Sequence, residues 1–209
     1  MRVISGTVRG RKLKEPVGFD IRPTSDLVKE SVFNIIQFDI EGRRVLDLFA
    51  GTGQLGIEAL SRGAKSAVFV DAKHEAVKLI WENLKICGLA EFAKVYTRDA
   101  LRYLVGDNPR LYSPGGEDQL DGAGNIKSGR MLDERKFDLI FLDPPYKTPL
   151  VGKALAKIIE IDKLNPNGII ICEIKADDVA PTVAPPYFLK KEYKYGSVKI
   201  ARFERGTIG

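Results

Sequence analysis

Short apolar runs alternate with amphipathic segments along most of the chain, and this alternation limits the possible folds more than any other feature. The runs are rich in β-branched and aromatic residues and mostly apolar on both faces, which is typical of strands buried in a parallel sheet. Five of them predict strands: RRVLDLFA (43–50), SAVFVDA (66–72), AKVYTRDA (93–100), FDLIFLDPP (137–145) and GIIICEIK (168–175).

The segments between these runs have the spacing of amphipathic helices. In residues 73–88, apolar side chains recur at three- and four-residue steps. The stretch 23–38 behaves alike, with Thr24 or Ser25 as the N-cap, and a further helix is expected near 150–162, ended by LNPNG. Helices between buried parallel strands predict a doubly wound α/β fold.

Both ends of the chain depart from that pattern. The first 14 residues hold five basic side chains and no acid, with Gly6 and Gly10 as turn candidates. They predict a small basic β-hairpin (1–16) ahead of the core. The C-terminal run YFLKKEYKYGSVKIARFER predicts two amphipathic strands around Gly196, so we expect an antiparallel hairpin to finish the sheet.

Residues 106–135 are rich in glycine and proline and show almost no periodicity. A loop of that length is uncommon inside a compact domain and is usually functional or disordered. It follows a short helix expected at about 100–105, which should return the chain to the amino edge of the sheet. We therefore expect a mobile insertion away from the ligand face.

Length and composition fit a single domain over residues 1–209. With 44% hydrophobic residues, the chain can bury one substantial core. The net charge of +5 and a pI near 9.1 fit a polyanionic partner without identifying it. Cys87 and Cys172 lie far apart with no second ligand at metal spacing, so neither a disulfide framework nor a metal site is expected. His74, the only histidine, lies near a helix start, which argues against a histidine base.

The N-terminus is basic but lacks the apolar region of a signal peptide. No window approaches the roughly 18 consecutive apolar residues of a membrane span. A cytoplasmic protein is therefore expected.

The first predicted strand leads into a glycine-rich loop, DLFAGTGQLG, where a ligand can approach the backbone closely. Gly51, Gly53 and Gly56 satisfy the G-x-G-x-x-G pattern, which by itself fits two classes of enzyme. A nicotinamide oxidoreductase would hold a pyrophosphate there, whereas a methyltransferase would hold S-adenosylmethionine, which has no phosphate. Asp47 favours the second class, because a carboxylate before the glycines would repel a pyrophosphate but could hold the cationic methionine part.

Two further predicted strands also end in an acid. Asp71 stands twenty residues beyond Gly51, where a carboxylate can bind ribose hydroxyls. Asp99 could accept a hydrogen bond from an adenine amino group, with the Ala100 nitrogen reaching a ring nitrogen, although Asp before a helix is also a common N-cap. Together with Asp47, these acids fit a line along an adenosyl ligand.

The strand at 137–145 ends in DPPY, which sheet pairing does not explain because proline cannot donate to a ladder. An exocyclic base amine is a poor nucleophile, since its lone pair is delocalised into the ring. The Asp143 carboxylate and the Pro144 carbonyl can accept its two hydrogens and free that pair for in-line attack on a methyl sulfonium. The prolines keep both acceptors rigid, and Tyr146 offers a ring on which an extruded base can stack.

These motifs resemble a known family. VLDLFAGTGQLGIEALSRGA followed by DPPY resembles the Rossmann-like, S-adenosylmethionine-dependent amino-methyltransferases. RPTSDLVKESVFNII ahead of the loop, with the opening MRVISGTVRGRKL, narrows the resemblance to the RsmD-type enzymes that methylate guanine N2 in 16S ribosomal RNA, at a site of the guanine(966)-N2 type. The resemblance covers about 1–105 and 136–205, and 106–135 is not part of the family pattern. It implies a seven-stranded sheet with helices on both faces.

Carried over by motif, the resemblance implies direct methyl transfer from S-adenosyl-L-methionine to a flipped base held by the DPPY residues. The partner it implies is 16S rRNA, within the small ribosomal subunit or its assembly intermediate, and a monomer without metal or membrane contact is expected. The implied catalytic residues are Asp143, Pro144, Pro145 and Tyr146. The implied cofactor-binding residues are Arg22, Pro23, Thr24, Asp47, Phe49, Gly51, Gly53, Asp71, Ala72, Asp99 and Ala100. RNA backbone contacts are implied for Arg9, Arg11, Lys12 and Lys147, the alternative being a hairpin whose charges are simply solvated.

Three rival functions stay open at this point. A DNA adenine-N6 methyltransferase shares the DPPY residues, but the chain has no room for a separate target-recognition domain. A nicotinamide oxidoreductase would leave DPPY unexplained. A noncatalytic RNA-binding relative would bind RNA and transfer nothing, and the intact motifs argue against it.

Overall fold

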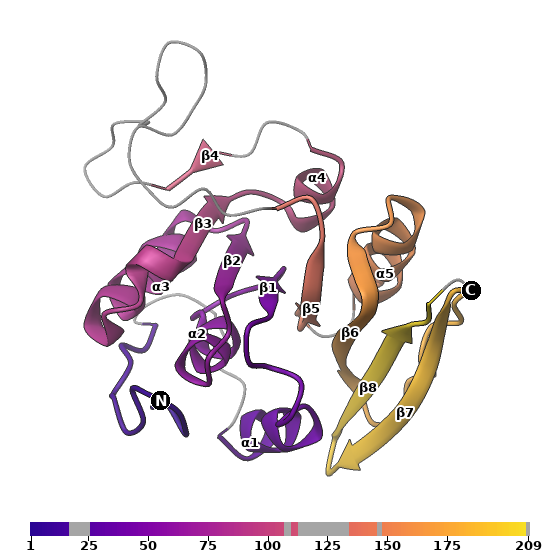
Figure 1. The fold of residues 1–209 in the computed structure, drawn as a ribbon, viewed down its shortest axis with the longest axis horizontal. Coiled ribbons are helices and arrows are strands. Elements are labelled where there is room, and N and C mark those ends of the chain that lie inside the picture. Colours follow the sequence, from indigo (N-terminus) through magenta and orange to yellow (C-terminus); the bar gives the residue numbers. More distant parts are fainter. Residues whose placement is uncertain (17–25, 107–109, 113–133, 146–147, 208–209) are drawn as a thin grey trace.

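The computed structural model describes residues 1–16, 26–106, 110–112, 134–145 and 148–207, and the structural statements below concern that part of the chain. Its strands form one sheet in the order β4-β3-β2-β1-β5-β6-β8-β7 (Figure 1). Five neighbouring strands run parallel: β3 (Ala93–Thr97), β2 (Ser66–Asp71), β1 (Arg44–Asp47), β5 (Phe137–Leu142) and β6 (Leu164–Lys175).

The C-terminal hairpin completes the sheet as the sequence predicts. β8 (Val198–Arg205) runs antiparallel to β6, and β7 (Tyr187–Tyr195) runs antiparallel to β8 at the edge. The expected Rossmann-like α/β sheet is confirmed, and a short additional strand, β4 (Arg110–Leu111), joins it at the opposite edge.

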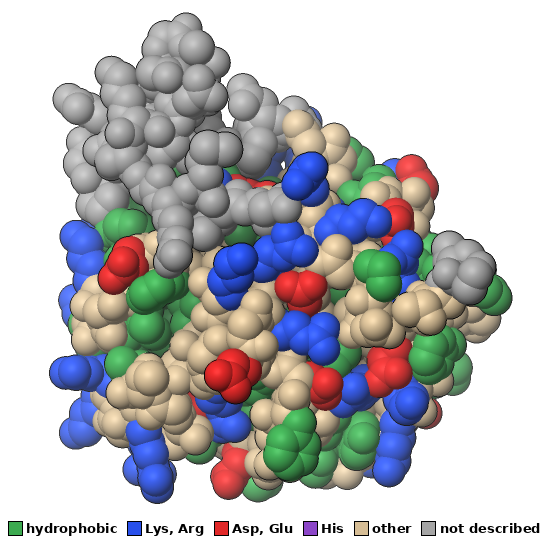
Figure 2. Space-filling view, in the orientation of Figure 1, with side chains coloured by type: hydrophobic (Ala, Val, Ile, Leu, Met, Phe, Trp, Pro, Cys, Tyr) green, Lys and Arg blue, Asp and Glu red, His purple; other side chains and the backbone are tan. Residues whose placement is uncertain are grey.

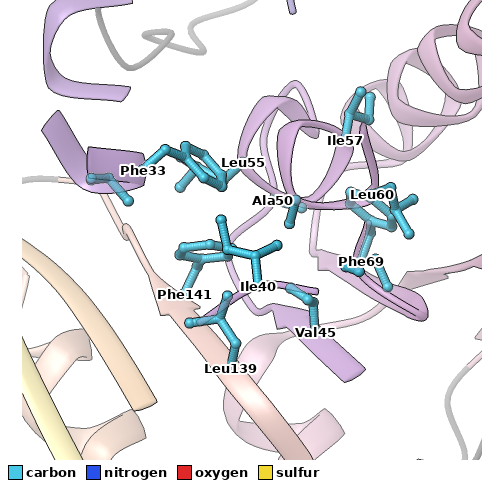
Figure 3. Close-up of a cluster of buried hydrophobic side chains, with 14 of the residues drawn as sticks. Phe33, Ile40, Val45, Ala50, Leu55, Ile57, Leu60, Phe69, Leu139 and Phe141 are labelled. Carbon is cyan, nitrogen blue, oxygen red and sulfur yellow. The ribbon is translucent and has the colours of Figure 1, made fainter. Parts of the chain in front are cut away.

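Helices cover both faces of the sheet (Figure 1). One face packs against α1 (Asp26–Ile35), α2 (Gln54–Ser61) and α3 (His74–Cys87), and the other packs against α4 (Ala100–Leu104) and α5 (Leu150–Glu160). Figure 3 shows the first of these cores, where the Phe33 ring of α1 tilts against Phe141 of β5 at 5.8 Å between centroids. A 3-10 turn (Ala90–Phe92) connects α3 to β3. With both faces covered, the carboxyl edge of the sheet is left to the loops.

The end of α5 differs from the expected one. The helix stops at Glu160, and Asp162 takes a left-handed backbone conformation (φ 51) that ends it, with the Lys163 nitrogen donating to the Ile158 carbonyl at 3.0 Å. The sequence LNPNG is therefore not the helix stop. It is the first part of β6, in which Leu164 pairs with Phe137 before the register shifts at a bulge.

The described residues within 106–135 contact the rest of the fold, while the mobility expected of the insertion stays a prediction. β4 pairs antiparallel with β3 through Leu111 and Tyr96, and the Tyr112 ring lies edge-on to His74 at 5.6 Å. At the far end, the Glu134 carboxylate accepts hydrogen bonds from the Tyr96 and Tyr103 hydroxyls at 2.8 and 3.0 Å. The position of residues 113–133 relative to the ligand face lies outside the described part of the chain.

The N-terminal residues form the expected hairpin, which packs against the core of the protein. Arg2 and Lys12 make an antiparallel bridge, and Val3 and Leu13 are buried in the same core cluster as α1, α2 and α3. Gly6, at φ 87, comes so close to α2 that an added Cβ atom would lie 1.9 Å from the Ser61 carbonyl oxygen. Glycine is needed there for both reasons, and the hairpin is part of the packed protein.

Among the described residues, no helix is long and apolar enough to span a bilayer.

Candidate cofactor and substrate site

The two motifs singled out in the sequence meet at the carboxyl edge of the sheet. β1 and β5 are neighbours, and Asp47 at the end of β1 is in register with Phe141 of β5. The chain leaves β1 toward α2 and β2 on one side, while β5 leads to β6 on the other. In open α/β sheets, this reversal of strand order is where ligands bind. The glycine loop and Asp143, two residues beyond Phe141, therefore lie on the two sides of the place where such a sheet forms its ligand crevice.

The glycine loop is held by the acid at the end of β2. The Asp71 carboxylate accepts a hydrogen bond from the Gly51 nitrogen at 2.9 Å and another from the Lys73 nitrogen at 2.9 Å. Gly51 and Gly53 have φ of 53 and 77, which favours glycine at both positions. Burial raises the pKa of Asp71, and the hydrogen bonds from Lys73 and Gly51 act in the opposite direction. Each carboxylate oxygen has a second lone pair, so the carboxylate can still accept ribose hydroxyls.

Asp47 supports the loop from beneath instead of facing solvent. It is 2% exposed, and its carboxylate accepts a hydrogen bond from the Gly56 nitrogen in the first turn of α2 at 3.1 Å. Burial raises the pKa of Asp47 to about 7, with the Asp71 charge adding to the rise. Gly56 itself is needed for packing, since an added Cβ atom would lie 2.3 Å from the Phe69 ring. The third glycine of the pattern thus brings helix and strand together.

The acid at the end of β3 serves as a helix cap. Asp99 is the N-cap of α4, and its side chain accepts a hydrogen bond from the Arg102 nitrogen at 3.1 Å. The N-cap role considered for Asp99 is therefore confirmed. The side chain is exposed, and Ala100 behind it is buried. Five of the expected cofactor-binding residues can be reached by a ligand, unlike the buried Asp47. Half-buried are Phe49, Gly51 and Asp71, and exposed are Ala72 and Asp99.

The DPPY motif begins where β5 ends. Asp143 is half-buried, Pro144 is buried and Pro145 is exposed. The Thr148 hydroxyl donates to the Pro145 carbonyl at 2.9 Å, which closes the turn before α5. Tyr146 and Lys147 lie outside the described residues, as do Arg22, Pro23 and Thr24.

An open pocket of about 320 Å³ adjoins this turn. Pro144, Pro145 and Thr148 form one wall, and Val151 and Gly152 at the start of α5 form the next. The remaining lining comes from the end of β6 and the loop after it: Glu173, Ile174, Lys175, Asp178, Val179 and Pro181. The volume is in the range of small-molecule sites, and prolines present flat apolar faces to a ring.

The three basic residues of the hairpin that are expected to contact RNA, Arg9, Arg11 and Lys12, are exposed. Figure 2 shows Lys and Arg side chains close together near the middle of the face it presents, with Asp and Glu side chains among and around them.

Sequence reasoning missed the buried polar residues that hold the hairpin in place, and Glu58 and Asn83 are two of them. Glu58 of α2 is fully buried and accepts hydrogen bonds from the Ile4 and Ser5 nitrogens at 2.7 and 2.9 Å. Asn83 of α3 is also fully buried and bonds both Lys14 and the glycine loop. One signal was available: polar side chains on the apolar stripe of a helix need buried partners.

The class of protein follows from this arrangement. A parallel sheet with a glycine loop and strand-end acids on one side of the reversal, and a proline motif on the other, is the α/β methyltransferase fold. The chain belongs to the family described as conserved hypothetical protein 95, whose model matches residues 1–110 and 123–204. Between its two matched segments the model leaves 111–122 unmatched, a shorter stretch than the 106–135 expected.

Relatives support the same assignment over nearly the whole chain. The Bacillus subtilis protein YlbH is 38% identical over 98% of this chain and 99% of its own length. The Haemophilus influenzae protein named ribosomal RNA small subunit methyltransferase D is 32% identical over 98% of this chain and 93% of its own. The expected RsmD-type family is thereby confirmed.

Solved structures agree on the fold. The yhhF protein of Escherichia coli superposes with a TM-score of 0.78 at 25% identity, covering 100% of this chain and 99% of that one. A more distant RNA methyltransferase from Salinibacter ruber, solved with S-adenosyl-L-homocysteine, shares the fold at 15% identity with a TM-score of 0.59, over 90% of this chain and 96% of that one.

Proposed function

We propose that this protein is an S-adenosylmethionine-dependent methyltransferase that modifies the exocyclic N2 of a guanine in 16S ribosomal RNA. The proposal is supported by the register of β1 with β5, since the glycine loop and the Asp143–Pro145 turn follow these neighbouring strands. The ribosomal substrate is supported by the relative named ribosomal RNA small subunit methyltransferase D. Such an enzyme works where ribosomes are assembled, in the cytoplasm.

On the cofactor side, the residues fit a cationic adenosyl ligand. Asp71 meets the ribose hydroxyls, Asp99 and the Ala100 nitrogen meet the adenine, and Gly51 and Gly53 let the ligand lie against the backbone. Arg22, Pro23 and Thr24 are assigned to the methionine end by the family resemblance. When bound, S-adenosylmethionine supplies an electrophilic methyl group on a sulfonium. The nearby carboxylates favour that positive charge.

On the substrate side, the chain's own groups activate and hold the base. The Asp143 carboxylate and the Pro144 carbonyl accept the two amine hydrogens, which directs the nitrogen lone pair toward the cofactor. The prolines hold these acceptors in place before the base arrives, so little reorganisation is needed. Tyr146 stacks on the base, and the pocket beside Pro144 and Pro145 receives the target nucleotide.

No covalent intermediate with the protein is needed. Cys87 and Cys172 are both buried, and burial raises the pKa of each thiol, so neither is a nucleophile for this step. The proton released after attack comes from a charged ammonium, a strong acid that can lose it to Asp143 or to water.

The exposed hairpin residues Arg9, Arg11 and Lys12, together with Lys147, contact the RNA backbone and set its position without reading sequence. The assembled small subunit or its precursor is the physiological form of the substrate.

One experiment tests this proposal directly. Radiolabelled S-adenosylmethionine is offered with small ribosomal subunits, naked 16S rRNA and duplex DNA, and the labelled base is then mapped. Label on guanine N2 in the rRNA is expected. Label only on adenine in DNA would establish the DNA adenine-N6 alternative, and label on no nucleic acid would contradict the proposal.

A further inference from the structure

Asn83 joins two parts of the protein that the proposed function assigns to different ligands. Its Oδ1 accepts a hydrogen bond from the Lys14 nitrogen at 2.7 Å. Its Nδ2 donates to the Lys14 carbonyl at 3.3 Å and to the Thr52 carbonyl at 3.2 Å. Thr52 lies between Gly51 and Gly53 of the cofactor loop, and Lys14 lies near the end of the basic hairpin. One side chain amide therefore bonds both segments.

The burial of Asn83 makes these bonds conditional on each other. The residue is fully buried, and both N–H groups and the amide oxygen are used. If the Lys14 segment moved away, the oxygen would lose its donor in a place that water does not reach. If the loop moved, an N–H group would lose its acceptor. Each segment thus favours the placement of the other.

Thr52 is the right point for such a link. It is 2% exposed, so its carbonyl has the Asn83 amide, rather than bulk solvent, as its donor. Its neighbours Gly51 and Gly53 have left-handed backbone conformations, and Gly51 is itself bonded by Asp71. Asp71 at the end of β2 and Asn83 of α3 therefore together fix the backbone conformation of the cofactor loop.

We infer that Asn83 is a positioning residue that couples the cofactor loop to the basic hairpin, so that cofactor and RNA each bind more tightly when the other is present. The inference rests on the proposed function for the identity of the two ligands. Because a coupling free energy is reciprocal, it is measurable from either ligand. A ligand that orders one segment stabilises the arrangement that the other ligand requires.

The test uses the full chain and the variant Asn83→Asp. The carboxylate keeps the acceptor for the Lys14 nitrogen but removes the donor to both carbonyls. Calorimetry measures the affinity for S-adenosylhomocysteine with and without a 16S rRNA transcript. We expect the transcript to tighten binding to the wild type at least about 5-fold, and to leave the variant unchanged.

The kinetic result separates positioning from general damage. Without RNA, Asn83→Asp should bind S-adenosylhomocysteine about 5- to 10-fold more weakly, the loss expected for one buried hydrogen bond. The KM for S-adenosylmethionine should rise by the same factor while kcat at saturation changes less than about 2-fold. Should Asn83→Asp fail to fold, Asn83→Ser, which keeps a small hydroxyl at the position, is measured in the same way.

Gly6→Ala provides the comparison, because it disturbs the hairpin at the Ser61 carbonyl of α2, a contact separate from the bonds between Lys14 and Asn83. It should weaken RNA binding but leave cofactor affinity without RNA within about 2-fold. Gly10→Ala is its matched control, since Gly10 has a similar φ of 79 and no atom within 4 Å of an added Cβ. Coupling retained in Asn83→Asp, or absent from a wild type that methylates rRNA, would overturn the inference. A wild type that methylates no RNA would instead contradict the proposed function.

Discussion

On the β1–β2 side of the proposed site, side chains bond the backbone of the glycine loop and of the helix after it: Asp71 bonds Gly51, Asp47 bonds Gly56 and Asn83 bonds Thr52. On the β5–β6 side, a proline turn borders an open pocket. The first construction suits a small cofactor of constant shape, which a rigid loop can fit closely. The second suits a nucleotide that belongs to a large RNA and needs a way in.

The largest effect is expected on the substrate side. Asp143→Ala removes one of the two proposed acceptors of the target amine, and kcat should fall by at least about 10²- to 10³-fold. The affinity for S-adenosylhomocysteine, measured by calorimetry, should stay within a factor of about 2 because the loop on the β1–β2 side is untouched. Normal transfer by this variant would show that the mechanism proposed for the DPPY motif is wrong.

On the cofactor side, Asp71→Ala should lower the affinity for S-adenosylhomocysteine by about 10- to 50-fold. The variant removes the acceptor for the Gly51 and Lys73 nitrogens as well as the proposed ribose contact. Asp71→Asn, which keeps one acceptor oxygen, should lose less. Equal affinities in all three proteins would remove Asp71 from the cofactor site.

A substitution that fills the pocket should affect RNA binding and leave cofactor binding unchanged. Gly152 lines it, and an added Cβ atom would find its nearest neighbour, Pro181, at 4.0 Å. Gly152→Leu should therefore fold well and even gain about 0.5–1 kcal/mol from helix propensity. We expect the KM for RNA to rise about 10-fold, with the KM for the cofactor unchanged. An unaltered KM for RNA would show that the target nucleotide does not use this pocket.

The smallest effect on activity is expected at the buried carboxyl group of Asp47, where a substitution should change stability instead. Its pKa is raised to about 7, so above the unfolded value of 3.8 the folded protein holds a proton that the unfolded chain has lost. The stability contributed by Asp47 therefore falls as pH rises from about 4 to 7 and stays low above that range. Asp47→Asn should be more stable than the wild type by about 1–3 kcal/mol at pH 8, with the advantage vanishing near pH 4.

Denaturant unfolding at a series of pH values checks this. If Asp47→Asn raised the free energy of unfolding equally at pH 4 and pH 8, the ionisation of Asp47 would not be the cause. The kcat of Asp47→Asn should equal that of the wild type. That result would show that Asp47 supports the fold, whereas Asp143 acts in the methyl transfer.

Local patterns in the sequence predicted the strands, the glycine loop and the capping acid well. Strand periodicity depends on neighbouring residues, and Asp99 caps a helix that begins at the next position. The contacts that were missed join distant residues: Asn83 bonds Lys14 across 69 positions, and Glu58 bonds Ile4 across 54. β4 was missed because its two residues form a strand only by pairing with β3.

Asp47 shows, within one motif, the same difference between what the local sequence predicts and what the packing decides. Its place before the glycines suggested a contact with the cofactor, whereas the structure buries it at 2% exposure beneath α2. The sequence shows that a carboxylate ends the strand. Its hydrogen-bond partner, the Gly56 nitrogen, is decided by the way α2 packs.

The sequence by itself determined the α/β fold, the positions of the two motifs along the chain and the family they belong to, because each is carried by residues that are close in sequence. Only the tertiary structure decided that the basic hairpin docks on α2 and that one buried amide connects it to the cofactor loop. Those contacts arise from the packing of α2, α3 and the N-terminus against one another, and no short stretch of sequence contains that information.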